Sequence, residues 1–150
     1  MDADVIIIGT GAGGGTLARA LAPSGLKLLL IERGDFLPRE KDNWRAVAVF
    51  GQHRYHNAEP WIDREGTPFR PVTGYHVGGN TKLYGAAVLR RRESDFGSVQ
   101  HAAGRTIAWP ISYTDLAPFY DTAEKWYFAH GLRGEDPTEP PGGAFPNPPV

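Results

Sequence analysis

A glycine-rich turn near the N-terminus is the part of this sequence whose residue spacing could do chemistry. Its glycines follow the pattern G-x-G-x-x-G at Gly9, Gly11 and Gly14. In such a turn the first glycine permits a sharp bend, the second lets a pyrophosphate approach the backbone, and the third lets a helix pack closely on a sheet. The helix that follows points N–H groups and a positive dipole end at the phosphates. We therefore predict a dinucleotide-binding turn formed by Gly9, Thr10, Gly11, Ala12, Gly13 and Gly14.

An acidic residue stands where the ribose of such a dinucleotide would be bound. Glu32 lies 18 residues after Gly14 and ends a second apolar run. Its carboxylate can accept hydrogen bonds from both ribose hydroxyls, and its charge would repel a 2′-phosphate. The neighbouring Arg33 could meet such a phosphate, but the acid weighs more. Glu32 and Arg33 are thus predicted cofactor-binding residues, with NADP disfavoured.

The elements that must position these residues can be read from the flanking pattern. Residues 5–8 form a mostly β-branched apolar run, which is typical of a strand buried on both faces of a parallel sheet. A helix is predicted over 14–22 and a second strand over 27–31. Strand, glycine turn, helix, strand and acid together predict an α/β, Rossmann-like FAD/NAD(P)-binding fold. Only these two strands are convincing, so the predicted fold is incomplete.

The rest of the chain is less regular. We expect a polar connection over 34–44 and an ambiguous segment over 44–50. The stretch 51–74 is interrupted by Pro60, Pro68 and Pro71, so we expect it to be irregular.

One amphipathic helix is predicted in the second half, over 112–131. Ser112 or Thr114 would cap it, Pro118 would lie in its first turn, and Gly131 would end it. Its aromatic stripe is expected to be packing. Residues 1–134 are thus a predicted partial cofactor-binding domain, and residues 135–150 a Pro/Gly-rich loop.

A second glycine-rich segment, residues 75–89, has the composition of a ligand-binding loop. Gly78 and Gly79 allow a ligand to come close, Asn80 and Thr81 supply hydrogen-bonding groups, and small residues over 85–87 could lie against a flat ring. A glycine turn before an ordinary strand or helix explains the same composition, so both interpretations stay open at this point.

Other polar clusters carry weaker signals. His53 and His56 lack a third ligand at suitable spacing, so no metal site is predicted. The run 90–92 of three arginines is interpreted as a solvated face or as local salt-bridge partners. A net charge of −1 gives no electrostatic case for nucleic acid. No cysteine and no membrane-spanning apolar run occur, and a cytoplasmic location is the default expectation.

These segments together resemble the N-terminal part of glucose–methanol–choline (GMC) family oxidoreductases. The resemblance covers nearly the whole chain and rests on three features: residues 3–14 with 31–34, residues 75–87 followed by 90–96, and residues 109–113 with 116–120 and 123–124. Asn80 and Tyr84 stand where the family's common signature has other residues. This resembles a choline-dehydrogenase-like or a sugar/polyol-dehydrogenase-like branch more than the glucose oxidase type.

The resemblance implies an FAD cofactor and a flavoprotein oxidoreductase acting on CH–OH groups. The flavin ring would lie against Asn80 to Ala86. The cofactor-binding residues implied for the second segment are Gly78, Gly79, Asn80, Thr81, Tyr84, Gly85 and Ala86. The substrate would be a small alcohol, polyol or sugar that transfers a hydride to flavin N5. The family's proton-accepting histidine lies near the C-terminus of a much longer chain, and no residue here matches that motif.

This sequence is therefore expected to be a truncated or split chain that is inactive alone and is completed by a complementing C-terminal chain. Two alternatives stay open at this point. One is a stand-alone, non-catalytic nucleotide-binding module, and the other is a fragment of an NAD-dependent dehydrogenase.

Overall fold

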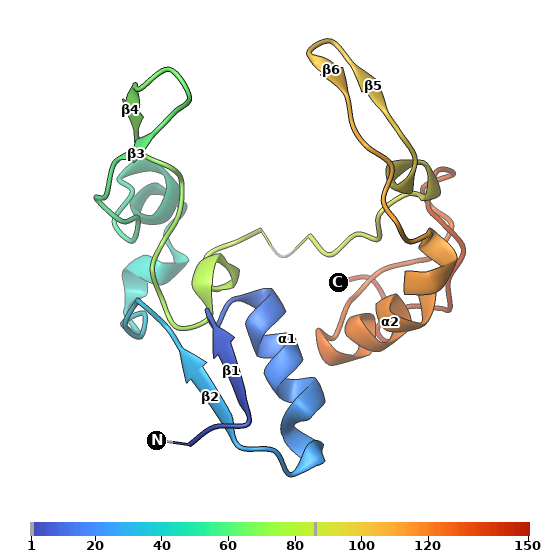
Figure 1. Ribbon diagram of the computed structural model, residues 1–150, viewed down its shortest axis with the longest axis horizontal. Coiled ribbons are helices and arrows are strands. Elements are labelled where there is room, and N and C mark those ends of the chain that lie inside the picture. The colour runs from blue at the N-terminus through green and yellow to red at the C-terminus, as the bar shows by residue number, and fades with distance from the viewer. Residues whose placement is uncertain (1, 86) are drawn as a thin grey trace. The chain divides into compact units, whose positions relative to one another are not determined.

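The computed structural model describes residues 2–85 and 87–150, and the chain divides into two units, Met1–Ala86 and Ala87–Val150. Ala86, one of the predicted cofactor-binding residues, lies outside the described residues. The two units are described separately below, with the elements labelled as in Figure 1.

The first unit begins with the predicted strand–helix–strand arrangement (blue in Figure 1). Strand β1 (Val5–Ile8) pairs in parallel with β2 (Leu28–Ile31), in a register that sets Val5 opposite Leu28. Helix α1 (Ala12–Leu21) connects them and passes through a 3-10 turn (Ala22–Ser24) into Gly25, which has a φ of +76°. The helix starts two residues before the predicted position, since Gly13 has joined its first turn.

The small parallel sheet is covered on one side only within the described residues. Ile7 is buried, whereas Ile6 is exposed and Ile8 retains 84% of its accessible surface. Because alternate side chains of a strand point to opposite faces, a single helix can cover only one set. The prediction of a strand buried on both faces is therefore wrong for this structure.

The remainder of the first unit contains short elements that the sequence pattern missed. A 3-10 turn (Lys41–Trp44) leads into a π-helical turn (Val47–Gly51), which buries Ala48 and Val49. Strands β3 (Trp61–Ile62) and β4 (Pro68–Phe69) then form an antiparallel hairpin. The expectation of an irregular stretch over 51–74 is thus wrong in part, because an isolated two-stranded hairpin has an outward edge that tolerates a proline. A last 3-10 turn covers Gly79–Lys82.

The second unit is organised around one helix, α2 (Tyr113–Trp126). A 3-10 turn (Glu93–Phe96) and a hairpin of β5 (Gln100–His101) and β6 (Gly104–Arg105) precede it. Ser112 caps the helix as predicted, because its hydroxyl oxygen accepts from the Asp115 N–H at 3.2 Å and Asp115 bonds back to its backbone. Residues 135–150 form no helix or strand.

The predicted C-terminal end of this helix is wrong. The helix stops at Trp126, and Phe128 takes the left-handed conformation (φ +53°) that we expected of a later glycine, Gly131. The Ala129 N–H donates to the Glu124 carbonyl at 2.9 Å and the Phe128 N–H to that of Lys125 at 3.3 Å. This hydrogen-bond pattern ends a helix regardless of which residue supplies the left-handed turn.

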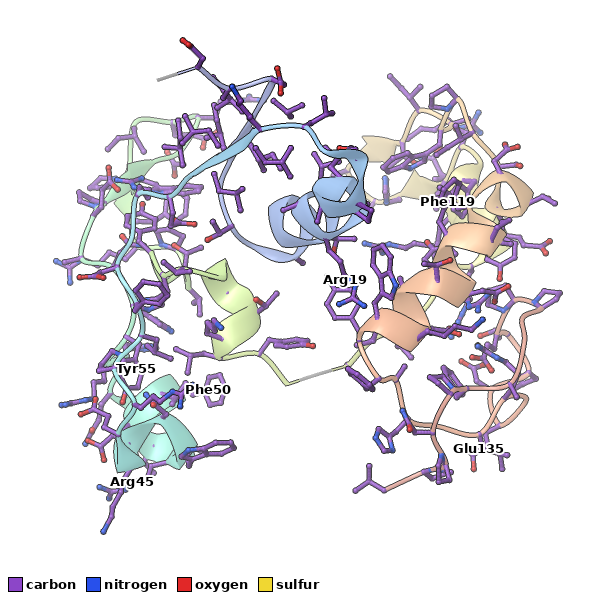
Figure 2. The ribbon with its side chains drawn as sticks, turned by 90° about the horizontal axis from the view of Figure 1, so that it is seen from below. Arg19, Arg45, Phe50, Tyr55, Phe119 and Glu135 are labelled. Carbon is purple, nitrogen blue, oxygen red and sulfur yellow. The ribbon has the colours of Figure 1, made fainter. Side chains whose placement is uncertain are left out.

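Two further predictions about α2 need correction. Pro118 is the sixth helical residue rather than part of the first turn, so one internal N–H is missing. The aromatic stripe packs only in part: Tyr113 is buried and stacks on Tyr120 at 5.9 Å between ring centroids, while Phe119 is exposed (Figure 2).

A buried ionic cluster attaches the start of the second unit to α2. The Arg90 side chain is 2% exposed and donates to both carboxylate oxygens of Glu124 at 2.7 Å, and to Asp121 at 2.5 Å. Arg133 donates to Glu124 as well, at 2.9 Å. Burial opposes the charge of Glu124, yet these two arginines hold its pKa below the ordinary value. The interpretation of residues 90–92 as a solvated face is therefore wrong for Arg90, whereas salt-bridge pairing is confirmed for Arg90 and for Arg92 with Asp136.

Replacing Arg90 with alanine should destabilise the second unit by about 3 kcal/mol, because it leaves a buried carboxylate with one partner fewer. Denaturant unfolding followed by circular dichroism measures this change. The matched control is Arg91→Ala, at an exposed position, which should change the free energy of unfolding by less than about 0.5 kcal/mol. Equal effects of the two substitutions would contradict the role given to the buried cluster.

Two neighbouring glycines of α1 should respond in opposite directions to alanine. A Cβ on Gly14 would clash with the Gly9 carbonyl oxygen, whereas a Cβ on Gly13 would meet nothing within 4 Å. Gly14→Ala should therefore destabilise the first unit by about 1–3 kcal/mol, and Gly13→Ala should stabilise it by up to about 1 kcal/mol. Thermal unfolding of the two variants checks the difference in sign, and a stable Gly14→Ala variant would refute the close packing.

Candidate cofactor-binding site

The glycine turn has the geometry that the motif predicts. Gly9 has a φ of +88°, which a residue with a side chain rarely adopts. Gly14 packs against the Gly9 carbonyl, so the helix lies close to the end of β1. Gly11, by contrast, caps α1 without any side-chain hydrogen bond, and a Cβ there would enter open space. The helix N-terminus is thus open to a ligand at Gly11.

The carboxylate of Glu32 is held at the end of β2 by four hydrogen bonds from the protein. One oxygen accepts from the Thr10 N–H at 2.9 Å and the Thr10 hydroxyl at 2.6 Å. The other accepts from the N–H groups of Arg33 at 2.9 Å and Gly34 at 3.1 Å. The Thr10 hydroxyl is the largest cause that lowers the pKa of Glu32 to about 2. Glu32 is therefore a charged residue that also ties β2 to the glycine turn.

Thr10 extends this link to the second glycine-rich segment. While its hydroxyl donates to Glu32, its oxygen accepts from the Gly78 N–H at 2.9 Å. A hydroxyl can do both at once because it has one donor and two acceptor positions. The sequence placed Thr10 in the turn but did not indicate this connection across 68 residues.

The two glycine-rich segments also touch through their backbones. A Cβ on Gly79 would lie 3.2 Å from the Gly11 Cα, and one on Gly34 would clash with the Tyr75 carbonyl. Asp35 and His76 form a parallel bridge, in which the Val77 N–H donates to the Asp35 carbonyl at 3.1 Å. The structure thus brings together the segments 9–14, 32–35 and 76–81, which are far apart in the sequence.

The other residues of the second segment that were predicted to bind a cofactor differ in their exposure and hydrogen bonds. Asn80 and Thr81 use their polar groups inside the turn: the Asn80 side-chain oxygen accepts from the Gly74 N–H at 2.9 Å, and the Thr81 hydroxyl donates to the Gly78 carbonyl. Tyr84 and Gly85 are exposed. The 3-10 turn therefore orders Asn80 and Thr81, whereas Tyr84 keeps an accessible ring.

Arg33 is already paired within the first unit. Its guanidinium lies 3.7 Å from the centre of the Tyr75 ring and 3.0 Å from a Glu59 carboxylate oxygen. The Tyr75 hydroxyl donates to the same carboxylate at 2.5 Å and, together with the Arg33 charge, lowers the pKa of Glu59. Sequence reasoning missed Tyr75 and Glu59 because no local pattern connects them to Arg33.

In residues 2–85 and 87–150, no group of three or more histidine, cysteine or acidic side chains is arranged to hold a metal ion. His53 and His56 lie side by side, with 4.6 Å between ring centroids. None of the described helices has the length and apolar character needed to cross a membrane.

The Thr10 hydroxyl should control the titration of Glu32. We expect a Glu32 midpoint near 2 in the folded protein, and a clearly higher midpoint in Thr10→Val, which loses the hydroxyl. Thr10→Ser keeps the hydroxyl and should titrate like the unmodified chain. Carbon-13 NMR of the Glu32 carboxyl measures all three midpoints.

The lowered pKa of Glu32 also makes the stability of the first unit depend on pH. Since folding lowers the pKa of Glu32 from 4.5 to about 2, its stabilising contribution is complete above about pH 4.5 and is lost as the pH falls toward 2. Thr10→Val should reduce that pH dependence. An unchanged Glu32 midpoint in Thr10→Val would show that the hydroxyl does not support the carboxylate.

Comparison with known proteins identifies relatives of this chain. No protein-family profile matches the chain. It is 34% identical to 2-methyl-1,2-propanediol dehydrogenase of Mycolicibacterium austroafricanum, over 91% of this chain and 26% of that protein. It is 32% identical to an uncharacterized GMC-type oxidoreductase of Sinorhizobium fredii, over 63% of this chain and 18% of that protein. The chain thus spans about a quarter or less of the length of these relatives.

A solved structure has a similar fold. Pyridoxine 4-oxidase from Mesorbium loti matches 98% of this chain with 28% of its own, at a TM-score of 0.59 and 23% identity. That likeness supports the α/β cofactor-binding fold, and the sequence relatives confirm the resemblance found in the motifs. The chain belongs to the glucose–methanol–choline family of oxidoreductases.

Proposed function

We propose that this chain is the FAD-binding, N-terminal portion of a GMC-family enzyme that oxidises the CH–OH group of a small alcohol, polyol or sugar. The contact between its two glycine-rich segments carries this proposal. A dinucleotide turn alone suits many cofactors, but here Thr10 and Gly11 meet Gly78 and Gly79 of the segment that resembles the flavin-binding stretch of the family.

The shape of the turn fits the phosphates of FAD. A Cβ at Gly11 or Gly13 would enter open space, so the backbone there is accessible to a group of that size. The first turn of α1 contains no acidic residue that would repel an anion. In this proposal Gly11, Ala12, Gly13 and Gly14 hold the pyrophosphate.

Glu32 takes two roles in this proposal. It holds the glycine turn through Thr10, and it accepts from the adenosine ribose. A carboxylate has about four acceptor positions, and all four are used in this structure. A ribose hydroxyl would therefore take the place of the Thr10 hydroxyl, the one side-chain donor among the four. The Thr10 N–H, 2.9 Å from Glu32, would still tie the turn to the carboxylate.

The mechanism divides the work between cofactor and protein. Bound FAD supplies the acceptor for the hydride that leaves the alcohol carbon. This chain would bind and orient the cofactor: the α1 N-terminus would hold its phosphates, Glu32 its ribose, and the segment from Asn80 to Gly85 would lie against its ring. The family's proton-accepting histidine lies near the C-terminus of a much longer chain, and no residue here matches that motif. We therefore expect the isolated chain to be inactive.

The diol named in one relative, 2-methyl-1,2-propanediol, supports a small alcohol as the substrate class. The charged carboxylate of Glu32 favours FAD or NAD over NADP, because it would repel a 2′-phosphate. The neighbouring Arg33 is paired with Glu59 and Tyr75. An NAD-dependent fragment would use the same βαβ unit but would leave the role of residues 78–85 unexplained.

Cofactor titration of two glycine variants, one inside and one outside the proposed site, tests the proposal. The chain should bind FAD more tightly than NAD, and Gly11→Ala should weaken FAD binding about tenfold, since its methyl group enters the space assigned to the phosphates. Gly143→Ala is the control, because its added Cβ also meets nothing within 4 Å but lies outside the site. Flavin fluorescence and calorimetry measure binding, and thermal unfolding checks that both variants fold. Tighter binding of NAD, or equal FAD affinity in both variants, would refute the assignment.

A further inference from the structure

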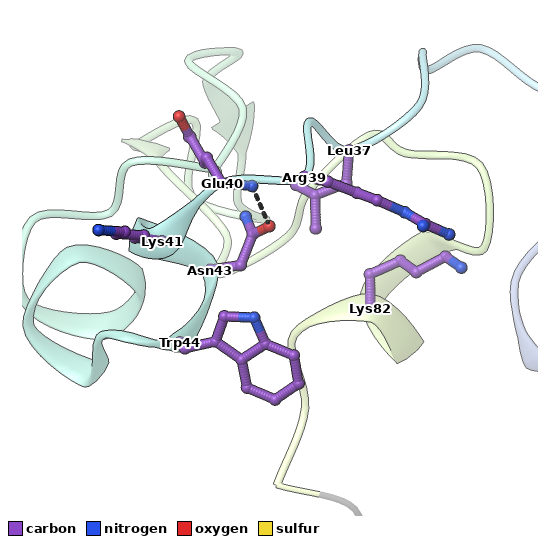
Figure 3. Close-up of a pocket in the computed structure, with 7 residues that line it drawn as sticks. All are labelled: Leu37, Arg39, Glu40, Lys41, Asn43, Trp44 and Lys82. Carbon is purple, nitrogen blue, oxygen red and sulfur yellow. Dashed lines mark hydrogen bonds between the residues drawn. The ribbon is translucent and has the colours of Figure 1, made fainter.

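The first unit contains a hollow that lies outside the glycine turn. It has a volume of about 740 Å³ and is formed by the connection after β2 together with the 3-10 turn of the second glycine-rich segment (Figure 3). It is lined by Leu37, Arg39, Glu40, Lys41, Asn43, Trp44 and Lys82. The function proposed above does not use this hollow.

The acidic residues beside the hollow are neutralised by other arginines. Both carboxylate oxygens of Glu40 accept from Arg54, at 3.0 and 3.2 Å, and one also accepts from the Tyr55 hydroxyl at 2.8 Å. The Arg54 side chain is the largest cause that lowers the pKa of Glu40. Asp42 is paired with Arg45 at 3.2 Å. Because these two carboxylates are paired with Arg54 and Arg45, they do not neutralise the cationic side chains that line the hollow.

The cations of the hollow have no such partners. The side chains of Arg39 and Lys82 form no ion pair or hydrogen bond with any residue in the described part of the chain. Figure 3 shows their cationic ends on the same side of the hollow, whereas the Glu40 carboxylate and Lys41 are turned away from it. A ligand on that side therefore meets two cations and no free carboxylate.

The other lining groups suit the organic part of such a ligand. Trp44 is 91% exposed, so its indole presents an open face. The Asn43 side-chain nitrogen is buried and has no acceptor among the described residues, while its oxygen accepts from the Glu40 N–H at 3.1 Å. The unpaired polar groups of Arg39, Asn43 and Lys82 are therefore all hydrogen-bond donors.

We propose that this hollow binds a phosphate group carried by a small organic molecule. Arg39 can hold two phosphate oxygens at once and Lys82 adds a point charge, as these two side chains do at phosphate sites generally. A volume of about 740 Å³ greatly exceeds that of a phosphate ion, so the organic part lies against Trp44 and Leu37. Because both phosphates of FAD are assigned to the glycine turn, the phosphate bound in this hollow belongs to a separate phosphorylated ligand.

NMR of the isotope-labelled chain tests the site directly. Ribose 5-phosphate should shift the Trp44 indole N–H and Asn43 side-chain amide signals, and ribose, which lacks only the phosphate, should not. Binding should weaken as the salt concentration rises, because the attraction is electrostatic. Absent shifts, or equal shifts with ribose, would overturn the proposal.

Charge-removing variants locate the site. Arg39→Gln and Lys82→Gln should each lower the affinity for ribose 5-phosphate about tenfold, the scale of one charge-assisted hydrogen bond. The matched control is Arg64→Gln, which removes an equal charge from a side chain that is 95% exposed and outside the hollow. An equal loss in the control would overturn the proposal in favour of general charge attraction. The backbone spectrum of each variant verifies that it is folded.

A further titration with ADP checks that the hollow is separate from the glycine turn. If the response of the Asn43 and Trp44 signals to ribose 5-phosphate persists once ADP saturates the glycine turn, the hollow serves a separate ligand. If ADP at that concentration shifts these two signals and removes the response, the hollow is part of the cofactor site and the proposal of a separate ligand is overturned. Failure of ADP and FAD to bind would count against the proposed function, while the ribose 5-phosphate titration still decides the hollow.

Discussion

The hydroxyl of Thr10 is the contact on which the first unit depends. It donates to Glu32 at the end of β2 and accepts from Gly78 in the second glycine-rich segment. Without it, the two glycine-rich segments would share only the close approach of Gly79 to Gly11. A single side chain thus couples three stretches of sequence that each have little structure of their own. The coupling is directional, because the charge of Glu32 fixes which way the hydroxyl hydrogen points.

In the second unit, buried ion pairs rather than a hydroxyl connect segments that are far apart in the sequence. The start of this unit is joined to α2 by Arg90, which reaches two acids of the helix, Asp121 and Glu124. Arg90 and Arg133 share Glu124, whose two oxygens both accept hydrogen bonds. Asp121 and Glu139 supply further negative charges, so the charges of the cluster are nearly balanced. Such a cluster specifies one arrangement of its segments, whereas an apolar contact would tolerate several.

Local patterns predicted the parts of the fold that depend on neighbours in sequence. The strand at 5–8, the glycine turn and the Ser112 cap were all predicted correctly, because apolar runs, glycine spacing and capping residues act within a few positions. The end of α2 was wrong, since Phe128 adopts a conformation that sequence reasoning assigns to glycine or asparagine.

Contacts over long separations could not be predicted in this way. Nothing in the residues around Arg90 distinguishes it from Arg91, yet one is buried among acids and the other is exposed. In the candidate site, the residues were predicted but their partners were not: Thr10 with Gly78, and Arg33 with Tyr75 and Glu59.

The separation between Thr10 and Gly78 also sets an order of assembly during synthesis. Strands β1 and β2 can pair once about 30 residues have emerged from the ribosome, but the Thr10 hydroxyl must wait for Gly78. In the interval Thr10 can donate to Glu32 but has no Gly78 N–H from which to accept. Of the site proposed for FAD, the glycine turn can therefore be completed before its contact with the second glycine-rich segment.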